Sequence, residues 1–320
     1  MFLKQRLATE RCARGRNSAT KAQSQEGPQK IGFVDLRASV SWWRGFESRR
    51  SDATVNGSTV CTSPTRDQFP MTRSLQEIAG SISTPLEKRL FAEYGAVFAT
   101  TATPPPTVIF RDAAGVEAFQ SSLGVQSANF GEHEITLQAA ALDALSAAAS
   151  RMAEQGASLT ARAADAGARS YEDTVRLWTR NVTRGFEHWV NAGRITWERA
   201  RSISKQPPAE QVAAILDLED TEQLFFGTFF DRSILYSVAA PGTSQHLSLL
   251  AFDVAEYEDS DVDVVLRSLG WYRTVPGDLP HFTYLGHIEE TLPSLGLKLI
   301  TRSYAQRMYD FWTPDIERLS

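Results

Sequence analysis

The sequence is poor in the residues from which proteins build cysteine-based sites. Its 320 residues include only two cysteines, Cys12 and Cys61, and five histidines. Two cysteines allow at most one internal disulfide and cannot form an all-cysteine zinc site. A metal site in this chain would therefore need histidine and carboxylate ligands, so each histidine deserves inspection.

Features of membrane-spanning and nucleic-acid-binding proteins are also missing. No stretch of about 20 apolar residues is present, so we expect no transmembrane segment. No secretory signal peptide is visible near the start of the chain. The formal net charge of −5 at pH 7 argues against a nucleic-acid-binding protein, which would carry a basic excess. Neither a phosphate-binding glycine-rich loop nor a dinucleotide-binding fingerprint appears.

The charge is divided unevenly along the chain. Residues 1–75 hold 13 Lys and Arg against 6 Asp and Glu, whereas residues 76–320 hold 20 against 32. The first segment is polar and basic, and we predict it to be disordered. A basic arm for anionic surfaces, or a translation start at Met71, are alternative interpretations. We interpret residues 76–160 as an N-terminal helical and α/β region and residues 161–320 as a catalytic domain.

Apolar periodicity predicts helices and short strands from Pro85 onwards. Apolar residues recur at helical spacing, often before glycine, over residues 85–95, 113–120, 137–154, 171–192, 196–204, 209–218 and 262–269. Short β-prone runs predict strands over residues 96–100, 107–110, 233–238, 251–257, 271–275 and 281–285. The predicted fold class is α+β, with a small antiparallel sheet flanked by helices and preceded by a mainly helical region.

Two histidines stand close to carboxylates in the predicted strand region. His246 precedes Asp253 by seven residues, and Asp278 precedes His281 by three. A catalytic zinc ion takes three protein ligands and keeps one position open. His246, Asp253 and His281 would supply such a set, with Asp278 as a general base. A core histidine and a turn-capping aspartate are the structural alternatives.

The local sequence around these residues resembles a known family. Residues 244–253 read S-Q-H-L-S-L-L-A-F-D, which resembles the S-x-H-x-x-G-x-A-x-D motif of the zinc D-alanyl-D-alanine carboxypeptidases. That family belongs to a group that includes lysostaphin-type endopeptidases and the hedgehog N-terminal domain. Residues 278–281, D-L-P-H, resemble the second family motif, E-x-W-H. The segment that begins at Arg169 resembles the G-Y-R-S-Y segment of the vancomycin-resistance-type enzymes.

The resemblance covers residues 166–286 and implies roles for individual residues. His246, Asp253 and His281 would be Zn²⁺ ligands, and Asp278 would take the position of the catalytic base. An arginine is expected to bind a carboxylate or the developing oxyanion. Arg169 and Arg232 are the candidates for that role, and Ser244, Gln245, Thr243 and His287 are expected to contact substrate.

Three departures from the family pattern bear on activity. Leu249 stands at the position of a family glycine, and Pro280 replaces a tryptophan. Asp278 replaces a glutamate, and the missing methylene draws the carboxylate back by about 1.5 Å. We predict a zinc metallopeptidase acting on peptidoglycan-type peptides, as a D-alanyl-D-alanine carboxypeptidase. The alternatives are a weak or inactive zinc-binding domain that recognises cell-wall peptide or glycan, and a zinc hydrolase of another amide.

The implied location conflicts with the visible sequence. Peptidoglycan lies outside the cytoplasm, so the resemblance implies a periplasmic or extracellular protein, although no export signal is visible. The sequence leaves the oligomeric state open.

Overall fold

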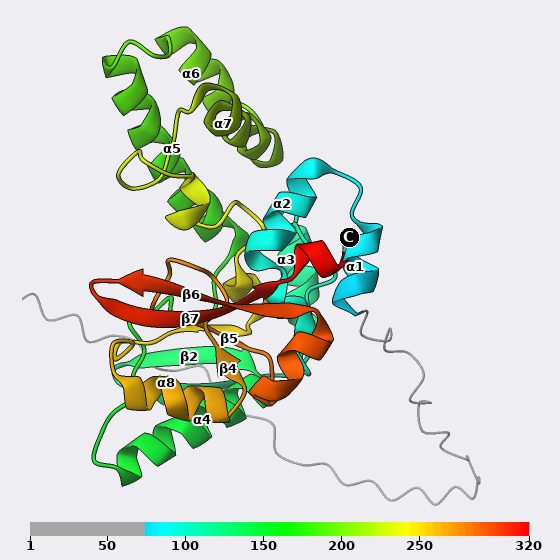
Figure 1. Cartoon of the computed structure of the whole chain (residues 1–320), viewed down its shortest axis with the longest axis vertical. Helices are drawn as coiled ribbons and strands as arrows, with labels where there is room; N and C mark the ends of the chain where they lie inside the picture. Colours follow the sequence, from blue (N-terminus) through cyan, green and yellow to red (C-terminus); the bar gives the residue numbers. More distant parts are fainter. Residues whose placement is uncertain (1–73, 320) are drawn as a thin grey trace, which may run out of the picture. The chain divides into compact units, whose positions relative to one another are not determined.

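The structure, a computed structural model, describes residues 74–319. Apart from its last two residues, the predicted basic segment lies outside the described residues. All described residues belong to one compact unit, and the boundary predicted near residue 160 lies inside it. The structure is α+β, with small antiparallel sheets and helices, as the sequence predicts (Figure 1).

The unit begins with helices and a β-hairpin. Helices α1 (Leu75–Ser81) and α2 (Pro85–Tyr94) are followed by a 3₁₀-helix, η1 (Gly95–Ala99), and by α3 (Ala113–Ser121). Strands β1 (Val125–Phe130) and β2 (His133–Gln138) form an antiparallel hairpin that leads into α4 (Ala139–Glu154). Gly131 takes a left-handed conformation, with φ of 69°, in the turn between the two strands.

Three helices follow as a separate layer at one end of the unit, at the top of Figure 1. They are α5 (Tyr171–Asn191), α6 (Trp197–Ser204) and α7 (Pro208–Glu222). Ser170 and Asp173 form a capping box at the start of α5, which supplies hydrogen-bond partners to otherwise unpaired backbone amides. Trp178, Val182 and Phe186 lie on the buried face of α5, as their spacing predicts. These apolar contacts attach the layer to α2 and to residues 224–240.

The central sheet carries the residues of greatest functional interest. Strands β3 (Ala251–Asp253), β5 (His281–Tyr284) and β4 (Trp271–Tyr272) form an antiparallel sheet in the order β3-β5-β4. Helix α8 (Ser260–Ser268) contacts α4, and Figure 1 shows the two side by side beneath the sheet. Phe252 and Phe282 are cross-strand partners and fully buried between these layers.

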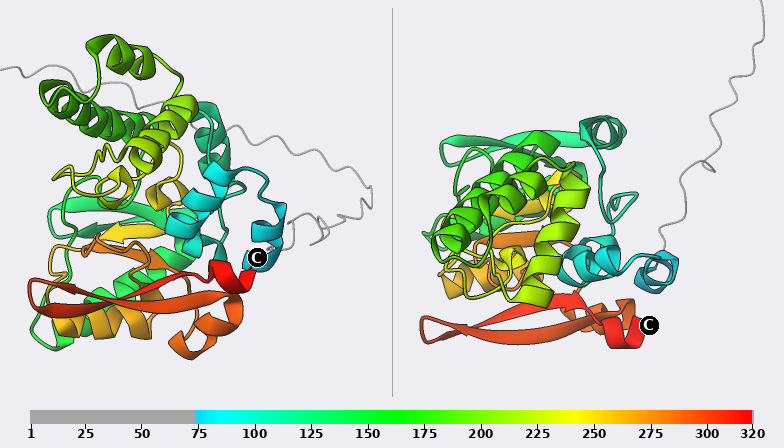
Figure 2. Two further views of the ribbon diagram at one scale, coloured as in Figure 1. Left: turned by 45° about the horizontal axis from the view of Figure 1, so that its top comes forward. Right: turned by 90° about the horizontal axis from the view of Figure 1, so that it is seen from above.

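A long hairpin completes the unit. Strands β6 (Leu297–Tyr304) and β7 (Arg307–Pro314) pair along their whole length, and in Figure 2 they form a layer of their own. The short 3₁₀-helices η2 (Ile234–Tyr236), η3 (Gln245–Ser248) and η4 (Glu289–Leu295) and helix α9 (Ile316–Leu319) occupy the connections. No helix among residues 74–319 combines the length and apolar character that crossing a membrane requires.

Three predicted strands are wrong. Residues 96–99 belong to η1, residues 107–110 have no regular structure, and residues 234–236 belong to η2. Short apolar runs do not distinguish a strand from a buried helical turn, and residues 95–99 are all buried. At residue 233 the serine hydroxyl accepts a hydrogen bond from the Leu235 amide and starts a helical turn instead.

The seven predicted helices are present, and the strands predicted from residues 251, 271 and 281 are present but shorter. The β1–β2 and β6–β7 hairpins were not predicted. Their strands are rich in polar and exposed residues, so they carry little of the apolar alternation that marks a half-buried strand.

Candidate metal centre

Three residues of the predicted ligand set come together in the structure. Asp253 ends β3 and His281 begins β5, and the two are paired directly across the antiparallel strands. His246 lies in η3, just before β3. His246 and His281 are almost completely buried, and Asp253 is partly exposed to a cleft. The strand register therefore places residues 28 positions apart in the sequence next to each other.

The connection from η3 to β3 depends on an unusual backbone conformation. Leu249 adopts a left-handed conformation with φ of 57° and ψ of 33°. A side chain in this region costs about 1–2 kcal/mol relative to an ordinary conformation, which is why glycine is favoured there. The family motif has glycine at this position, and this chain keeps the turn with a buried leucine instead.

The three potential ligand atoms converge around one carboxylate oxygen. His246 Nε2 lies 3.3 Å and His281 Nδ1 lies 3.1 Å from Oδ1 of Asp253. One ligand atom from each residue can be chosen so that all three lie within 4.8 Å of one another. Among the residues that the structure describes, this is the one His, Cys, Asp and Glu cluster of that kind.

Hydrogen bonding fixes the protonation of His246. Its Nδ1 lies 2.7 Å from the backbone carbonyl oxygen of Gly167, which can only accept a hydrogen bond. The proton of neutral His246 is therefore on Nδ1, and Nε2 presents a lone pair. Burial is the main cause of a lowered pKa at His246, and it favours this neutral form. Nε2 is buried and has no hydrogen-bond partner.

Gln245 fixes the orientation of His281 and the position of its proton. The Gln245 amide nitrogen donates to the backbone carbonyl of Tyr94 at 2.9 Å, so its Oε1 faces the opposite side. There Oε1 accepts hydrogen bonds from the hydroxyls of Thr274 and Thr283 and lies 2.8 Å from His281 Nε2. His281 therefore donates from Nε2 and, when neutral, turns an unprotonated Nδ1 towards Asp253.

The carboxylate of Asp253 is shared between the histidines and an arginine. Its Oδ1 faces both imidazoles, and its Oδ2 accepts a hydrogen bond from Arg169 Nη2 at 2.9 Å. Burial acts to raise the pKa of Asp253, but interactions with His246 and His281 outweigh it and hold that pKa well below its ordinary value. The side chain is thus a carboxylate. When both histidines are neutral, the cluster offers two lone-pair nitrogens and one anionic oxygen. This donor set suits a cation.

The cluster lies in a cleft of about 490 Å³, which also exposes Asp278. Asp278 belongs to the turn between β4 and β5, where Gly277 has a φ of 100°. Its carboxylate has no hydrogen-bond partner among residues 74–319. Although Asp278 is accessible from the cleft, the protein around it displaces part of its surrounding water, and this desolvation is the main cause of a raised pKa at Asp278, which His281 partly offsets. Asp278 is therefore a free proton acceptor beside the cluster.

Buried Arg273 supports the turn that carries Asp278. Its Nε donates to the backbone carbonyl of Leu279 at 2.8 Å, and its guanidinium pairs with Asp263. The guanidinium carbon lies 4.3 Å from the ring centroid of Phe282 and 5.2 Å from that of Tyr309. This role could not be predicted from the sequence, because these partners come from three separate segments, around residues 263, 279–282 and 309.

The other predicted site residues divide into two groups. Arg169 and Ser244 line the cleft. Gln245 also reaches the cleft, but both ends of its amide are engaged by the protein, so it supports His281 rather than offering a free group to substrate. Thr243 lies outside the cleft, and its hydroxyl donates to the carbonyl of Ala240.

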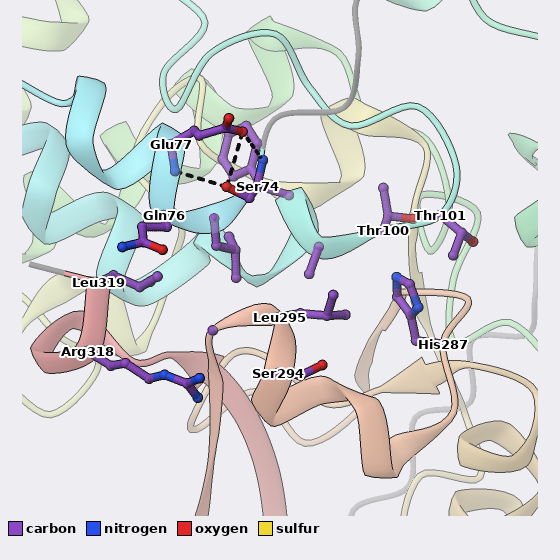
Figure 3. Close-up of a pocket in the computed structure, with 14 residues that line it drawn as sticks. Ser74, Gln76, Glu77, Thr100, Thr101, His287, Ser294, Leu295, Arg318 and Leu319 are labelled. Atoms are coloured by element: carbon purple, nitrogen blue, oxygen red, sulfur yellow. Dashed lines mark hydrogen bonds between the residues drawn. The ribbon is translucent and has the colours of Figure 1, made fainter.

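Arg232 and His287 are not brought to the cleft. Arg232 is exposed and pairs with its neighbour Asp231. His287 lines a separate cavity of about 720 Å³. Figure 3 shows His287 in that cavity together with Thr101 and with Ser74 at the start of the described chain. Arg232 and His287 were predicted to lie at the site because they are close to the motifs in the sequence. Sequence distance does not determine the direction in which a connecting segment turns.

Comparisons with known proteins identify no family for this chain. No protein-family model matches the chain, and no curated protein or solved structure matches it.

Proposed function

We propose that His246, Asp253 and His281 bind Zn²⁺ and that the protein is a zinc metallopeptidase. The observation that carries this proposal is the convergence of one nitrogen from each of two buried imidazoles on one carboxylate oxygen, at 3.1 and 3.3 Å. When both histidines are neutral, these atoms present lone pairs to one another unless a cation lies between them. Tetrahedral zinc with bonds of about 2.0–2.1 Å separates its ligand atoms by about 3.3 Å. The two nitrogen–oxygen separations fit that requirement.

The proposed reaction is hydrolysis of a peptide bond in a peptidoglycan-type peptide, as in a D-alanyl-D-alanine carboxypeptidase. Zinc in this position would supply Lewis acidity, activating water and polarising the scissile carbonyl. Asp278 would accept a proton during attack, since its carboxylate is free and desolvation raises its pKa. Arg169 would hold Asp253 in its ligand orientation and present its remaining N–H groups to the cleft.

A binding domain without turnover is the second candidate. The specific observation in its favour is that an aspartate, one methylene shorter than the family glutamate, occupies the position of the base, and no hydrogen bond holds its carboxylate. Proton transfer requires hydrogen-bond reach, so a retracted carboxylate would weaken catalysis. Such a domain would still bind zinc and peptide.

Turnover by the zinc-loaded protein separates the two candidates. We expect release of D-alanine from an acetylated peptide that ends in D-Ala-D-Ala, and we expect Asp278→Asn to lower kcat by about 10²–10⁴-fold. Zinc content should stay near one per chain in this variant. Peptide binding without turnover by the wild type would favour the binding domain, and hydrolysis of other amides only would favour an amidohydrolase.

A further inference from the structure

The cleft extends beyond the proposed zinc ligands along helix α5. Leu177, Arg180 and Asn181 of α5 line this part, together with Thr228, Tyr236 and Ser237 from the segment that follows α7. A cleft of about 490 Å³ falls in the range that holds ligands larger than a terminal alanine dipeptide. The outer part is therefore available to the portion of a substrate that precedes the bond to be cut.

Arg180 gives this outer part a positive charge. Arg162, Arg169 and Arg180 line the cleft against only two carboxylates, Asp253 and Asp278. Arg169 is paired with Asp253, whereas Arg180 forms no ion pair within residues 74–319. The chain as a whole has a net charge of −5, so the cleft differs in sign from the rest of the protein. Bound zinc would add further positive charge.

Asn181 contributes a second, independent feature. Its side chain is 7% exposed, and its amide nitrogen donates to the backbone carbonyl of Leu177 at 3.0 Å. Its Oδ1 has no hydrogen-bond partner within the described part of the chain, although the residue lines the cleft. This oxygen is not among the buried atoms that lack a partner, so it remains an open acceptor that water or a ligand in the cleft can reach. A peptide N–H is a suitable donor.

Building on the proposed peptidase function, we infer that Arg180 and Asn181 form a subsite for an acidic peptide. Arg180 binds a carboxylate that lies upstream of the scissile bond, and Asn181 accepts a hydrogen bond from the peptide backbone beside it. The substrate is then a peptide longer than two residues, with a carboxylate in addition to the one at its C-terminus.

Two peptides that differ by one charge test this subsite. One is a tetrapeptide ending in D-Ala-D-Ala that contains a γ-linked D-glutamate, and the other carries an amide in place of the free glutamate carboxylate. We expect kcat/KM of the wild type to favour the acidic peptide by about threefold to tenfold, because one partly exposed ion pair is added. Arg180→Ala should remove this preference through KM, and Arg180→Glu should reverse it.

The matched control is Arg201→Ala. Arg201 is exposed on α6, does not line the cleft and forms no ion pair within residues 74–319, so its loss changes the net charge equally. The control should keep the preference. Equal kcat/KM for the two peptides in the wild type, or an unchanged preference in Arg180→Ala, would overturn the subsite.

Calorimetry with the corresponding product tripeptides measures binding alone, and so it tests the subsite independently of turnover. We expect the acidic tripeptide to bind more tightly to the wild type, and this difference to vanish in Arg180→Ala. Absence of hydrolysis with this binding difference intact would overturn the peptidase function alone. Hydrolysis without any binding difference would overturn the subsite alone.

Discussion

The inner part of the cleft, around His246, Asp253 and His281, differs from the outer part along α5 in how its polar side chains are paired. In the inner part, each imidazole nitrogen that faces away from Asp253 is hydrogen-bonded to a carbonyl oxygen, of Gly167 or of Gln245. In the outer part, Arg180 is exposed and has no ion-pair partner among residues 74–319, and Asp278, beside the cluster, also lacks a side-chain partner there. The comparison indicates that ligand geometry is set before any ion or substrate arrives, while groups that would meet a substrate remain free. Preorganised ligands and unpaired recognition groups are what a metallopeptidase needs.

Loss of an inner ligand should have the largest effect. We expect His246→Ala to lower zinc affinity by about a thousandfold or more, because the variant loses one of the three proposed ligands. Elemental analysis and competition with a chelator measure this. His133→Ala is the control, since His133 is a half-buried residue of β2 outside the cluster. Full zinc content in His246→Ala would contradict the ligand assignment.

Loss of the support behind a ligand should have an intermediate effect. Gln245→Leu removes the acceptor that holds His281, so we expect zinc affinity to fall by about 10–100-fold. Gln138→Leu is a matched control, because Gln138 is also buried and its amide bonds Thr103 and Ser248 rather than a ligand. Both variants should lower the melting temperature. An equal fall in zinc affinity in both would show that Gln245 acts only through general stability.

Substitutions in the turn between η3 and β3 should have the smallest effect. At Leu249 the stability order of the alanine and glycine variants should be the reverse of the order at Leu250. Leu249→Ala and Leu249→Gly both lose buried apolar surface, but only glycine relieves the left-handed conformation. We therefore expect the glycine variant to be the more stable of the two, by about 1 kcal/mol in the free energy of unfolding. At Leu250, which is buried but outside the positive-φ region, alanine should be the more stable. Urea unfolding of the four variants measures both differences, and the same order at both positions would contradict the role given to Leu249.

Features that depend on residues close together in the chain could be predicted from the sequence. Helix α5 was predicted from its own spacing and its final glycine, and His246 and Asp253 from one ten-residue motif. Gln245 was assigned to substrate because its partners, Tyr94, Thr274 and Thr283, lie far away in the chain. Arg232 and His287 were placed by proximity to the motifs, and turns direct both elsewhere. Asn181 looked like part of an ordinary helix face, and its position on the cleft became apparent only from the packing of α5.

The pairing of Asp253 with His281 makes the proposed metal site dependent on the register of strands β3 and β5. Successive residues of a strand point to opposite faces, so a slip of one residue between β3 and β5 would turn the two side chains away from each other. A misregistered sheet could still bury apolar residues, but the three proposed ligands would no longer meet. Metal uptake during refolding therefore measures correct strand registration, and a metal ion present at that stage would selectively stabilise chains that had paired in register.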